Sequence, residues 1–259
     1  MKVMGILNVT PDSFSDGGLY RTVDQACFHA EKMIQEGADI LDIGGESTRP
    51  CAIPVSVQEE LDRVIPVIEK LHQTFNIPLS IDTLKPAVMQ AALSAGVWMI
   101  NDVNALQAEG ALDVAVSREV KICLMHKQGE PRTMQVAPHY EDVVQEVTNF
   151  LLARKQICIN AGIPSERIFL DPGIGFGKNL EHNVALLKNL DKLPGPILLG
   201  VSRKAMLGTL LNLPENQKYQ RLPGSVALAV WAAIKNVAII RVHDVKETVQ
   251  ALTVIEAVL

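Results

Sequence analysis

Several features that would place a chain of 259 residues in a particular class are missing from this sequence. Its four cysteines, Cys27, Cys51, Cys123 and Cys158, form no Cys-x-x-Cys pair, so their spacing indicates neither a disulfide framework nor a zinc site. No apolar run approaches the roughly 18 residues that a membrane-spanning helix needs. The amino terminus lacks the basic and apolar stretches of a secretory signal. We therefore expect a cytoplasmic protein that does not contact membranes.

Neither aromatic residues nor charges of one sign are concentrated in the chain. Lys and Arg together number 24 and Asp and Glu 29, which gives a formal net charge of −5. Because the cations are scattered, the electrostatic footprint of a nucleic-acid-binding protein is missing. Aromatic residues make up 4% of the chain and all hydrophobic residues 48%, so the core must be built mainly from aliphatic side chains. Such a core suits buried parallel strands.

Short aliphatic runs recur eight times, and each one stops at a polar group. Between them lie segments with apolar residues every three or four positions, which is typical of amphipathic helices. Strands that alternate with helices predict a parallel sheet, and eight of them predict one (β/α)8 TIM barrel that forms a single domain over residues 1–259. An open, doubly wound sheet is the alternative. The eight runs are Val3–Leu7, Ile40–Ile43, Pro78–Ile81, Trp98–Ile100, Ile122–Met125, Ile168–Leu170, Ile197–Val201 and Ala238–Ile240.

Local signals indicate where some of the helices begin and end. Gly37, Gly96 and Gly162 stand where helices should stop, and Asp244 with Glu247 three residues later resembles a capping box. The stretch around 204–213 predicts an extra short helix after the seventh strand.

Polar residues stand at or just after the ends of the strands, where barrels of this kind assemble their active sites. Any one of them has an ordinary explanation as a helix cap, a turn residue or a member of a surface ion pair. Nine at one rim favour a ligand site instead. They are Asn8, Thr48, Arg49, Asp82, Asn101, Asp171, Lys204, Arg241 and His243.

Arg241 and His243 alternate along one strand, so both side chains should face the barrel interior. An unpaired cation would be costly there, and a guanidinium matches phosphate with two hydrogen bonds. We therefore expect an anion between them. The alternative is that Arg241 forms an ion pair with Asp82 or Asp171.

The glycine-rich stretch DPGIGFGK at 171–178 is not a nucleotide-binding motif. A Walker loop would need Gly at 172 and Ser or Thr at 179, and the dinucleotide pattern breaks at Lys178. Its glycines instead allow the backbone to approach a ligand or a neighbouring loop closely. The buried carboxylate of Asp171 could accept two adjacent N–H groups, such as those of a pterin or guanine ring.

The other strand-end residues complement this carboxylate. Asn101 can donate and accept hydrogen bonds along the edge of such a ring, whereas Lys204 can only donate. The sequence offers no cluster of His and Cys for a metal. If a metal takes part, oxygen ligands such as the amide of Asn8 suit Mg²⁺.

Ordered motifs along nearly the whole chain resemble the dihydropteroate synthase family of pterin-binding barrels. The resemblance implies a (β/α)8 barrel and a transferase of folate biosynthesis. Such an enzyme joins p-aminobenzoate to 6-hydroxymethyl-7,8-dihydropterin diphosphate and releases diphosphate. It also implies a homodimer through the late helices and a target for sulfonamides. The motifs are GILNVTPDSFSDGG (5–18), DIGGESTRP (42–50), SIDT (80–83), IND (100–102), MHKQGEPRTMQ (125–135), LDPGIGFGK (170–178), GVSRK (200–204) and RVHDV (241–245).

The resemblance also implies a role for each matched site residue. Asp82, Asn101, Asp171 and Lys204 would hold the pterin, whereas Thr48, Arg241 and His243 would serve the diphosphate. Asn8 would be a ligand of Mg²⁺ together with the diphosphate. Phe14, Pro50 and Phe176 would form the aminobenzoate pocket. The residues expected to be catalytic are Lys204, Asp82, Asp171, Arg241 and His243.

Four positions depart from the family pattern. Cys51 and Asn236 stand where glycine is common, and Lys127 where methionine is common. Ala205 follows Lys204 where a serine is frequent, so a hydroxyl that could bind the carboxylate of aminobenzoate is missing. Three other functions remain open on the sequence alone: a pterin-dependent methyltransferase, a Schiff-base aldolase using Lys204, and a pterin-binding barrel without turnover.

Overall fold

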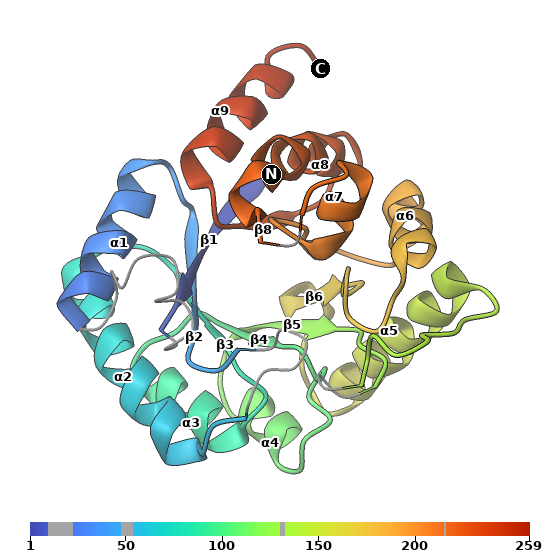
Figure 1. Ribbon diagram of the computed structural model, residues 1–259. Coiled ribbons are helices and arrows are strands. Elements are labelled where there is room, and N and C mark those ends of the chain that lie inside the picture. The colour runs from blue at the N-terminus through green and yellow to red at the C-terminus, as the bar shows by residue number, and fades with distance from the viewer. Residues whose placement is uncertain (10–22, 48–53, 130–132, 215) are drawn as a thin grey trace.

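The computed structural model describes residues 1–9, 23–47, 54–129, 133–214 and 216–259. Eight parallel strands, enclosed by helices, form one sheet in the order β6-β5-β4-β3-β2-β1-β8-β7 (Figure 1). A parallel bridge between Leu170 and Ile197, at the start of the seventh strand, joins the two edges of this sheet. The structure is therefore a nearly closed barrel, which confirms the predicted fold and excludes an open doubly wound sheet.

Each predicted aliphatic run forms a strand, with ends that shift by one or two residues. The chain order places a helix between successive strands, as a parallel barrel requires. The strands are β1 (Lys2–Asn8), β2 (Ile40–Gly44), β3 (Leu79–Asp82), β4 (Met99–Asp102), β5 (Lys121–Met125), β6 (Ile168–Asp171), β7 (Leu198–Gly200) and β8 (Ile239–Val242).

The helices cover the outside of the barrel (Figure 1). The short helix predicted after the seventh strand is present as α7 (Ala205–Leu210). None of the described helices is long and apolar enough to cross a membrane. The other elements are α1 (Val23–Gln35), α2 (Val57–Thr74), α3 (Pro86–Ser94), α4 (Ala111–Val116), α5 (Val143–Asn160), α6 (Leu180–Lys188), α8 (Leu222–Ile234) and α9 (Val245–Glu256), with 3-10 turns η2 (Ser165–Arg167), η3 (Leu190–Lys192) and η4 (Lys218–Arg221).

The ends of the helices follow the predicted signals with one exception. Gly37, Gly96 and Gly162 have φ angles of 99°, 102° and 101°, the left-handed conformation that ends a helix. Asn236, which stands where the related family has glycine, adopts the same region at 55° after α8. The predicted capping box at Asp244 is wrong, because this carboxylate makes no cap hydrogen bond and instead takes two from Arg203, at 3.0 and 2.6 Å.

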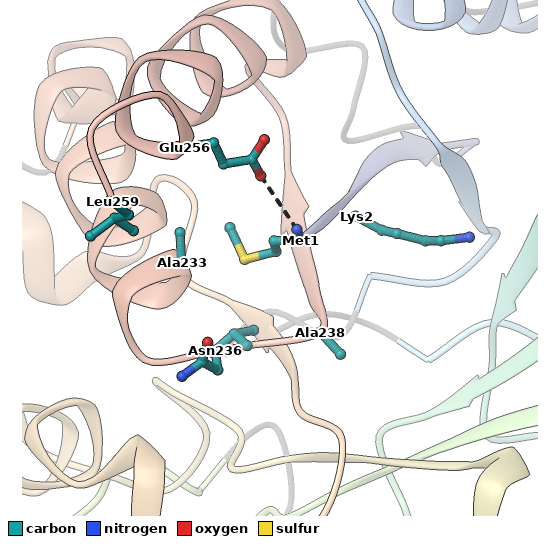
Figure 2. Close-up of a pocket in the computed structure, with 8 residues that line it drawn as sticks. Met1, Lys2, Ala233, Asn236, Ala238, Glu256 and Leu259 are labelled. Carbon is teal, nitrogen blue, oxygen red and sulfur yellow. Dashed lines mark hydrogen bonds and ion pairs between the residues drawn. The ribbon is translucent and has the colours of Figure 1, made fainter.

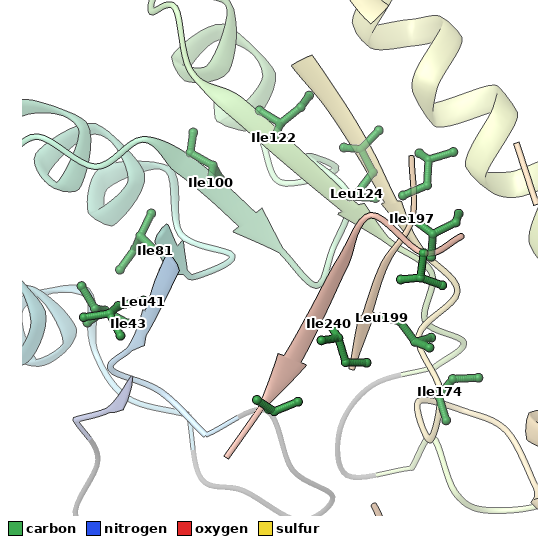
Figure 3. Close-up of a cluster of buried hydrophobic side chains, with 14 of the residues drawn as sticks. Leu41, Ile43, Ile81, Ile100, Ile122, Leu124, Ile174, Ile197, Leu199 and Ile240 are labelled. Carbon is green, nitrogen blue, oxygen red and sulfur yellow. The ribbon is translucent and has the colours of Figure 1, made fainter. Parts of the chain in front are cut away.

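Aliphatic side chains on the outer faces of the strands pack beneath the helices and form the main core (Figure 3). A second, smaller cluster contains Met4, Ile40, Met99, Cys123, Leu198 and Ile239. These side chains alternate with the outer ones and fill the amino-terminal half of the barrel interior. Among the described residues, the inward-pointing Asp82 and Asn101 stand at or near the carboxyl ends of their strands, beyond this apolar cluster.

The interior cluster predicts a clear difference between two leucines. Leu198 is completely buried in it, whereas Leu152 on α5 is 45% exposed. Leu198→Ala should lower the free energy of unfolding by about 2–5 kcal/mol, because a cavity remains inside a closed barrel. The matched variant Leu152→Ala should change it by no more than about 0.5 kcal/mol. Urea denaturation of both variants measures this, and equal losses would contradict the assignment of Leu198 to a separate interior cluster.

Candidate active site

The carboxyl ends of the strands bring together side chains that are far apart in the sequence. Asn8 of β1 lies opposite Gly44 of β2, and Gly44 lies opposite Asp82 of β3, which in turn lies opposite Asn101 of β4. Because Gly44 has no side chain, the space between its neighbours stays open. A Cβ atom placed there would lie 3.4 Å from Asn8 Oδ1 and 3.7 Å from Asp82 Cβ. Asn8 and Asp82 therefore border the same hollow at the barrel mouth.

Arg241 of β8 crosses the barrel interior and meets two carboxylates. Its Nε donates to Asp42 Oδ2 at 2.5 Å, and its Nη2 donates to Asp82 Oδ2 at 2.7 Å. Of the two ion pairs considered from the sequence, the one with Asp82 is present. Burial disfavours the guanidinium charge, but Asp42 and Asp82 outweigh it and raise the pKa of Arg241 above its ordinary value. The group is a fixed cation at the centre of the mouth.

Asp42 was not predicted as a site residue. It lies in the middle of β2 and is completely buried, and the same oxygen that binds Arg241 accepts a hydrogen bond from Asn101 Nδ2 at 3.1 Å. Only the inward alternation of β2 could have revealed it, since the residue interrupts an aliphatic run at a position that faces the interior. Asp42 thus joins the amide and the guanidinium through one atom.

Three buried oxygen atoms near this ion pair have no hydrogen-bond partner among the described residues: Asp42 Oδ1, Ser80 Oγ and Asp82 Oδ1. Buried polar atoms without partners are rare because they cost free energy. Asp82 lies at the open end of the barrel, so its free oxygen is available to a ligand that donates an N–H group.

Two carboxyl groups of the mouth have strongly raised pKa values. Burial raises the pKa of Asp82 to about 7, although Arg241 lowers it in part, and Asp42 raises it further. Burial also raises the pKa of Asp171 to about 6, against the opposing effects of the Gly173 N–H and of Lys204. Carboxyl groups whose pKa values are strongly raised by burial are typical of functional sites.

The sequence predicted that the glycines of 171–178 permit a close approach, and the structure shows what they approach. Asp171 Oδ1 accepts a hydrogen bond from Gly173 N at 2.7 Å. The turn then places the ring of Phe176 4.2 Å from Lys204 Nζ, in a cation–π contact. Asp171, Phe176 and Lys204 therefore form one wall of the mouth.

His243 follows β8 directly and is held by Ser202, which follows β7. Ser202 Oγ lies 3.0 Å from His243 Nδ1 and accepts a hydrogen bond from His243 N at 3.1 Å. The contact holds the imidazole ring through its Nδ1 atom. Sequence reasoning missed Ser202, since a serine in a turn carries no distinctive signal.

Four of the rim residues predicted from the sequence, or from the resemblance, lie outside the described residues: Phe14, Thr48, Arg49 and Pro50. Residues that flank the segment 48–53 are anchored by charges. Lys85 Nζ donates to Glu46 Oε2 and to the fully buried Glu60 Oε2, both at 2.6 Å. This cluster fastens Glu46, which follows β2, to Glu60 of α2.

No group of three or more His, Cys, Asp or Glu side chains among the described residues is arranged to hold a metal ion. The donor set at the mouth is different: the neutral amide oxygen of Asn8 borders the same hollow as Asp82. Mg²⁺ prefers oxygen ligands and keeps waters or substrate phosphates in its other positions. These residues therefore fit Mg²⁺ only in company with an anionic substrate.

A pocket of about 580 Å³ lies at the opposite end of the barrel (Figure 2). Met1, Lys2, Ala238 and Glu256 contribute to its lining, and the terminal amino group lies 3.5 Å from Glu256 Oε1. This pocket contains none of the strand-end residues. We place the candidate site at the mouth because the partnerless buried oxygens and the shifted carboxyl pKa values are found there.

Comparison with known proteins shows similarity over nearly the whole chain. The family model described as "Pterin binding enzyme" matches residues 4–243. The dihydropteroate synthase of Escherichia coli K12 is 52% identical over 99% of this chain and 91% of its own length. The crystal structure of Yersinia pestis dihydropteroate synthase with a sulfonamide drug complex has a TM-score of 0.95 at 52% identity, covering 99% of this chain and 94% of that one. A Xanthomonas albilineans dihydropteroate synthase with 4-aminobenzoic acid has a TM-score of 0.92 at 52% identity, covering 99% and 92%.

The raised pKa of Asp171 makes a prediction about stability. Its folded-state pKa of about 6 lies above the ordinary 3.8, so the folded protein binds more protons and loses stability as the pH rises from about 4 to about 6. Asp171→Asn keeps an acceptor for Gly173 and carries no charge. At pH 8 it should be more stable than the wild type by about 3 kcal/mol, from a shift of about 2 units.

Urea unfolding at pH 8 and pH 5 measures this difference. The gain should shrink at pH 5, where the wild-type carboxyl group is largely protonated. A gain of the same size at both pH values, or a loss at pH 8, would contradict the burial of a costly charge at this position.

Proposed function

The chain belongs to the pterin binding enzyme family and to its dihydropteroate synthase members, and from this premise we propose which of its groups carry the reaction. It is a transferase that joins p-aminobenzoate to 6-hydroxymethyl-7,8-dihydropterin diphosphate, giving 7,8-dihydropteroate and diphosphate in folate biosynthesis. The convergence of Asp82 of β3, Asn101 of β4 and Arg241 of β8 on one mouth is the observation that carries the residue roles.

The pterin ring lies against the acceptors of the barrel mouth. Asp42 can only accept, so the Asn101 amide turns one N–H towards it and keeps Oδ1 for the ligand. Asp171, Asp82 and Asn101 then receive the N–H groups of the ring. Lys204 supplies a donor for a ring acceptor. A ring rich in N–H groups also uses the free oxygen of Asp82.

The difficult step is the departure of diphosphate. The C–O bond of the pterin methylene group breaks, the electron pair leaves with the diphosphate oxygen, and the electron-rich dihydropterin ring stabilises the remaining cation. Arg241 and His243 stabilise the charge that develops on the leaving group. Arg241 is held by Asp42 through Nε and by Asp82 through Nη2, which fixes the guanidinium at the mouth.

The amine then attacks the methylene cation and loses a proton as the new C–N bond forms. An aromatic amine is neutral and nucleophilic at pH 7, so the site needs no strong base. The residues expected to surround it are Phe176, which belongs to the described wall, and Phe14 and Pro50. The Yersinia and Xanthomonas relatives were crystallised with a sulfonamide complex and with 4-aminobenzoic acid. Sulfonamides act on this chain at the same pocket.

We propose Mg²⁺ as the cofactor, with Asn8 Oδ1 as its protein ligand. When bound, Mg²⁺ neutralises part of the diphosphate charge. Because the site offers few protein oxygens, the metal and the diphosphate should bind together.

A homodimer in the cytoplasm is also part of the proposal. Ile234 of α8 and Val254 of α9 are 44% and 67% exposed, and the two helices pack against each other. Exposed apolar side chains on adjacent elements are compatible with an interface between two copies.

The function is tested with the two substrates and Mg²⁺. We expect one diphosphate released for each dihydropteroate formed, and loss of turnover when EDTA removes the metal. Release of diphosphate without the amine product, tight pterin binding without any turnover, or a borohydride-trapped adduct at Lys204 would each contradict the proposal. Sedimentation of the same preparation tests the dimer independently.

Because different residues are proposed to bind the pterin and the diphosphate, two variants should each weaken the binding of a different ligand. Arg241→Ala should weaken binding of inorganic diphosphate at least about tenfold, since a charge-assisted hydrogen bond is lost. Asn101→Ala should weaken binding of 6-hydroxymethylpterin and leave diphosphate affinity nearly unchanged. Calorimetry with each ligand measures both. If the two variants affect the same ligand, the roles are wrong.

Two further variants test the wall formed by Asp171 and Lys204. Asp171→Ala and Lys204→Ala should abolish measurable turnover while the far-ultraviolet circular dichroism stays native. Equal loss of folded structure would instead make these two residues structural.

A further inference from the structure

Lys178 ends the glycine-rich stretch and has no part in the chemistry described above. Only 2% of its surface is exposed. Its Nζ lies 2.8 Å from His126 Nδ1, 3.0 Å from Gly173 O and 3.0 Å from Phe176 O. These three acceptors match the three hydrogens of an ammonium group.

The surroundings of this ammonium group are costly for a cation. Within the described residues no carboxylate forms an ion pair with it. Burial lowers the pKa of Lys178 to about 7, although the charge of Asp171 opposes the change. Burial and the Lys178 charge also lower the pKa of His126 to about 3, so its ring is neutral and Nδ1 can accept. A buried charge without an ion pair does little for stability.

The three acceptors belong to two loops that lie against each other. Gly173 and Phe176 belong to the β6 loop (residues 172–179), and His126 begins the β5 loop (residues 126–129). A Cβ at Gly173 would lie 1.9 Å from His126 O, and one at Gly177 would lie 2.3 Å from Gln128 O. The backbones are therefore in direct contact, and Lys178 ties them together.

The residue that gains a fixed position from this arrangement is Phe176. Its carbonyl oxygen is held by Lys178 Nζ, and its neighbours are held by neutral contacts. Gly175 N donates to Asn183 Oδ1 at 2.7 Å, and Tyr140 Oη donates to Gly177 O at 2.9 Å. Of the groups assigned to the pterin, Asp82 and Asn101 stand on other strands. Asp171 and Lys204 do contact this loop, through Gly173 N and the Phe176 ring, but each stands outside it, so the loop's own contribution to the mouth is Phe176.

We propose that Lys178 is a positioning residue for the second substrate: its side chain fixes the peptide of Phe176, and with it the wall against which p-aminobenzoate binds. This inference rests on the proposed function for its kinetic consequence. The contact that Lys178 makes with both loops, here called the clasp, does not depend on substrate and can be tested separately.

The test replaces the ammonium group by an apolar group of similar length, Lys178→Met, in the full chain. We expect the KM for p-aminobenzoate to rise at least about tenfold, because small displacements of a binding wall have large kinetic effects. The KM for the pterin diphosphate should change less than about threefold. Hydrogen–deuterium exchange in residues 172–179 should become faster in the free protein.

The urea midpoint of Lys178→Met distinguishes a positioning role of Lys178 from a merely structural one. Removal of the buried cation stabilises the folded state, whereas loss of its hydrogen bonds to Gly173 O and Phe176 O destabilises it. The two effects oppose each other, so the urea midpoint should change little. The matched control is Lys121→Met: Lys121 also donates to a backbone carbonyl, Glu166 O at 3.1 Å, but at the other end of the barrel. It should change neither KM nor exchange in the β6 loop.

The proposal is overturned if Lys178→Met leaves the KM for p-aminobenzoate unchanged, or if both KM values rise together while the urea midpoint falls. If Lys178→Met does not fold, His126→Leu removes one of the three acceptors and should shift the same KM to a smaller extent; no shift overturns the proposal as well. A wild type without turnover would refute the proposed function instead, and faster exchange in Lys178→Met would still support the clasp.

Discussion

The site depends on one guanidinium group enclosed by a closed sheet. Arg241 lies between Asp42 and Asp82 inside the barrel, where a cation or an anion alone would be unstable. Two carboxylates around one cation leave an excess of negative charge, which burial relieves by raising the pKa of Asp82. The mouth therefore presents buried acceptor atoms that suit a ligand with N–H groups.

The division of the barrel interior explains why this polar centre is tolerated. The apolar side chains of the interior cluster, which includes Met4 and Ile239, fill the amino-terminal half of the barrel. The polar groups of the site lie towards the half that opens at the mouth. The stabilising core lies outside the strands, under the helices. Stability and chemistry are thus supplied by different faces of the same strands, so the strand ends can carry costly groups.

Much of the fold and several of the site residues could be predicted from the sequence, because the relevant signals are local. Eight aliphatic runs that end at polar residues gave the strands, and residues such as Asn8, Asp82 and Arg241 stand where a run stops. Asp42 could not be found in this way, since its importance comes from side-chain contacts across the barrel with Asn101 of β4 and Arg241 of β8. The capping box predicted at Asp244 was wrong because the carboxylate binds Arg203, a partner 41 positions away. Lys178 was noticed only as the residue that breaks a nucleotide motif.

The contact between the β5 and β6 loops has a consequence for how such a protein can change over evolutionary time. Gly173 and Gly177 leave no room for a side chain because carbonyl oxygens of the facing loop occupy that space. An insertion or an altered length in either loop would have to be matched in the other. The two segments are therefore expected to be inherited as a pair, and a chimera built from two related enzymes should exchange both of them together.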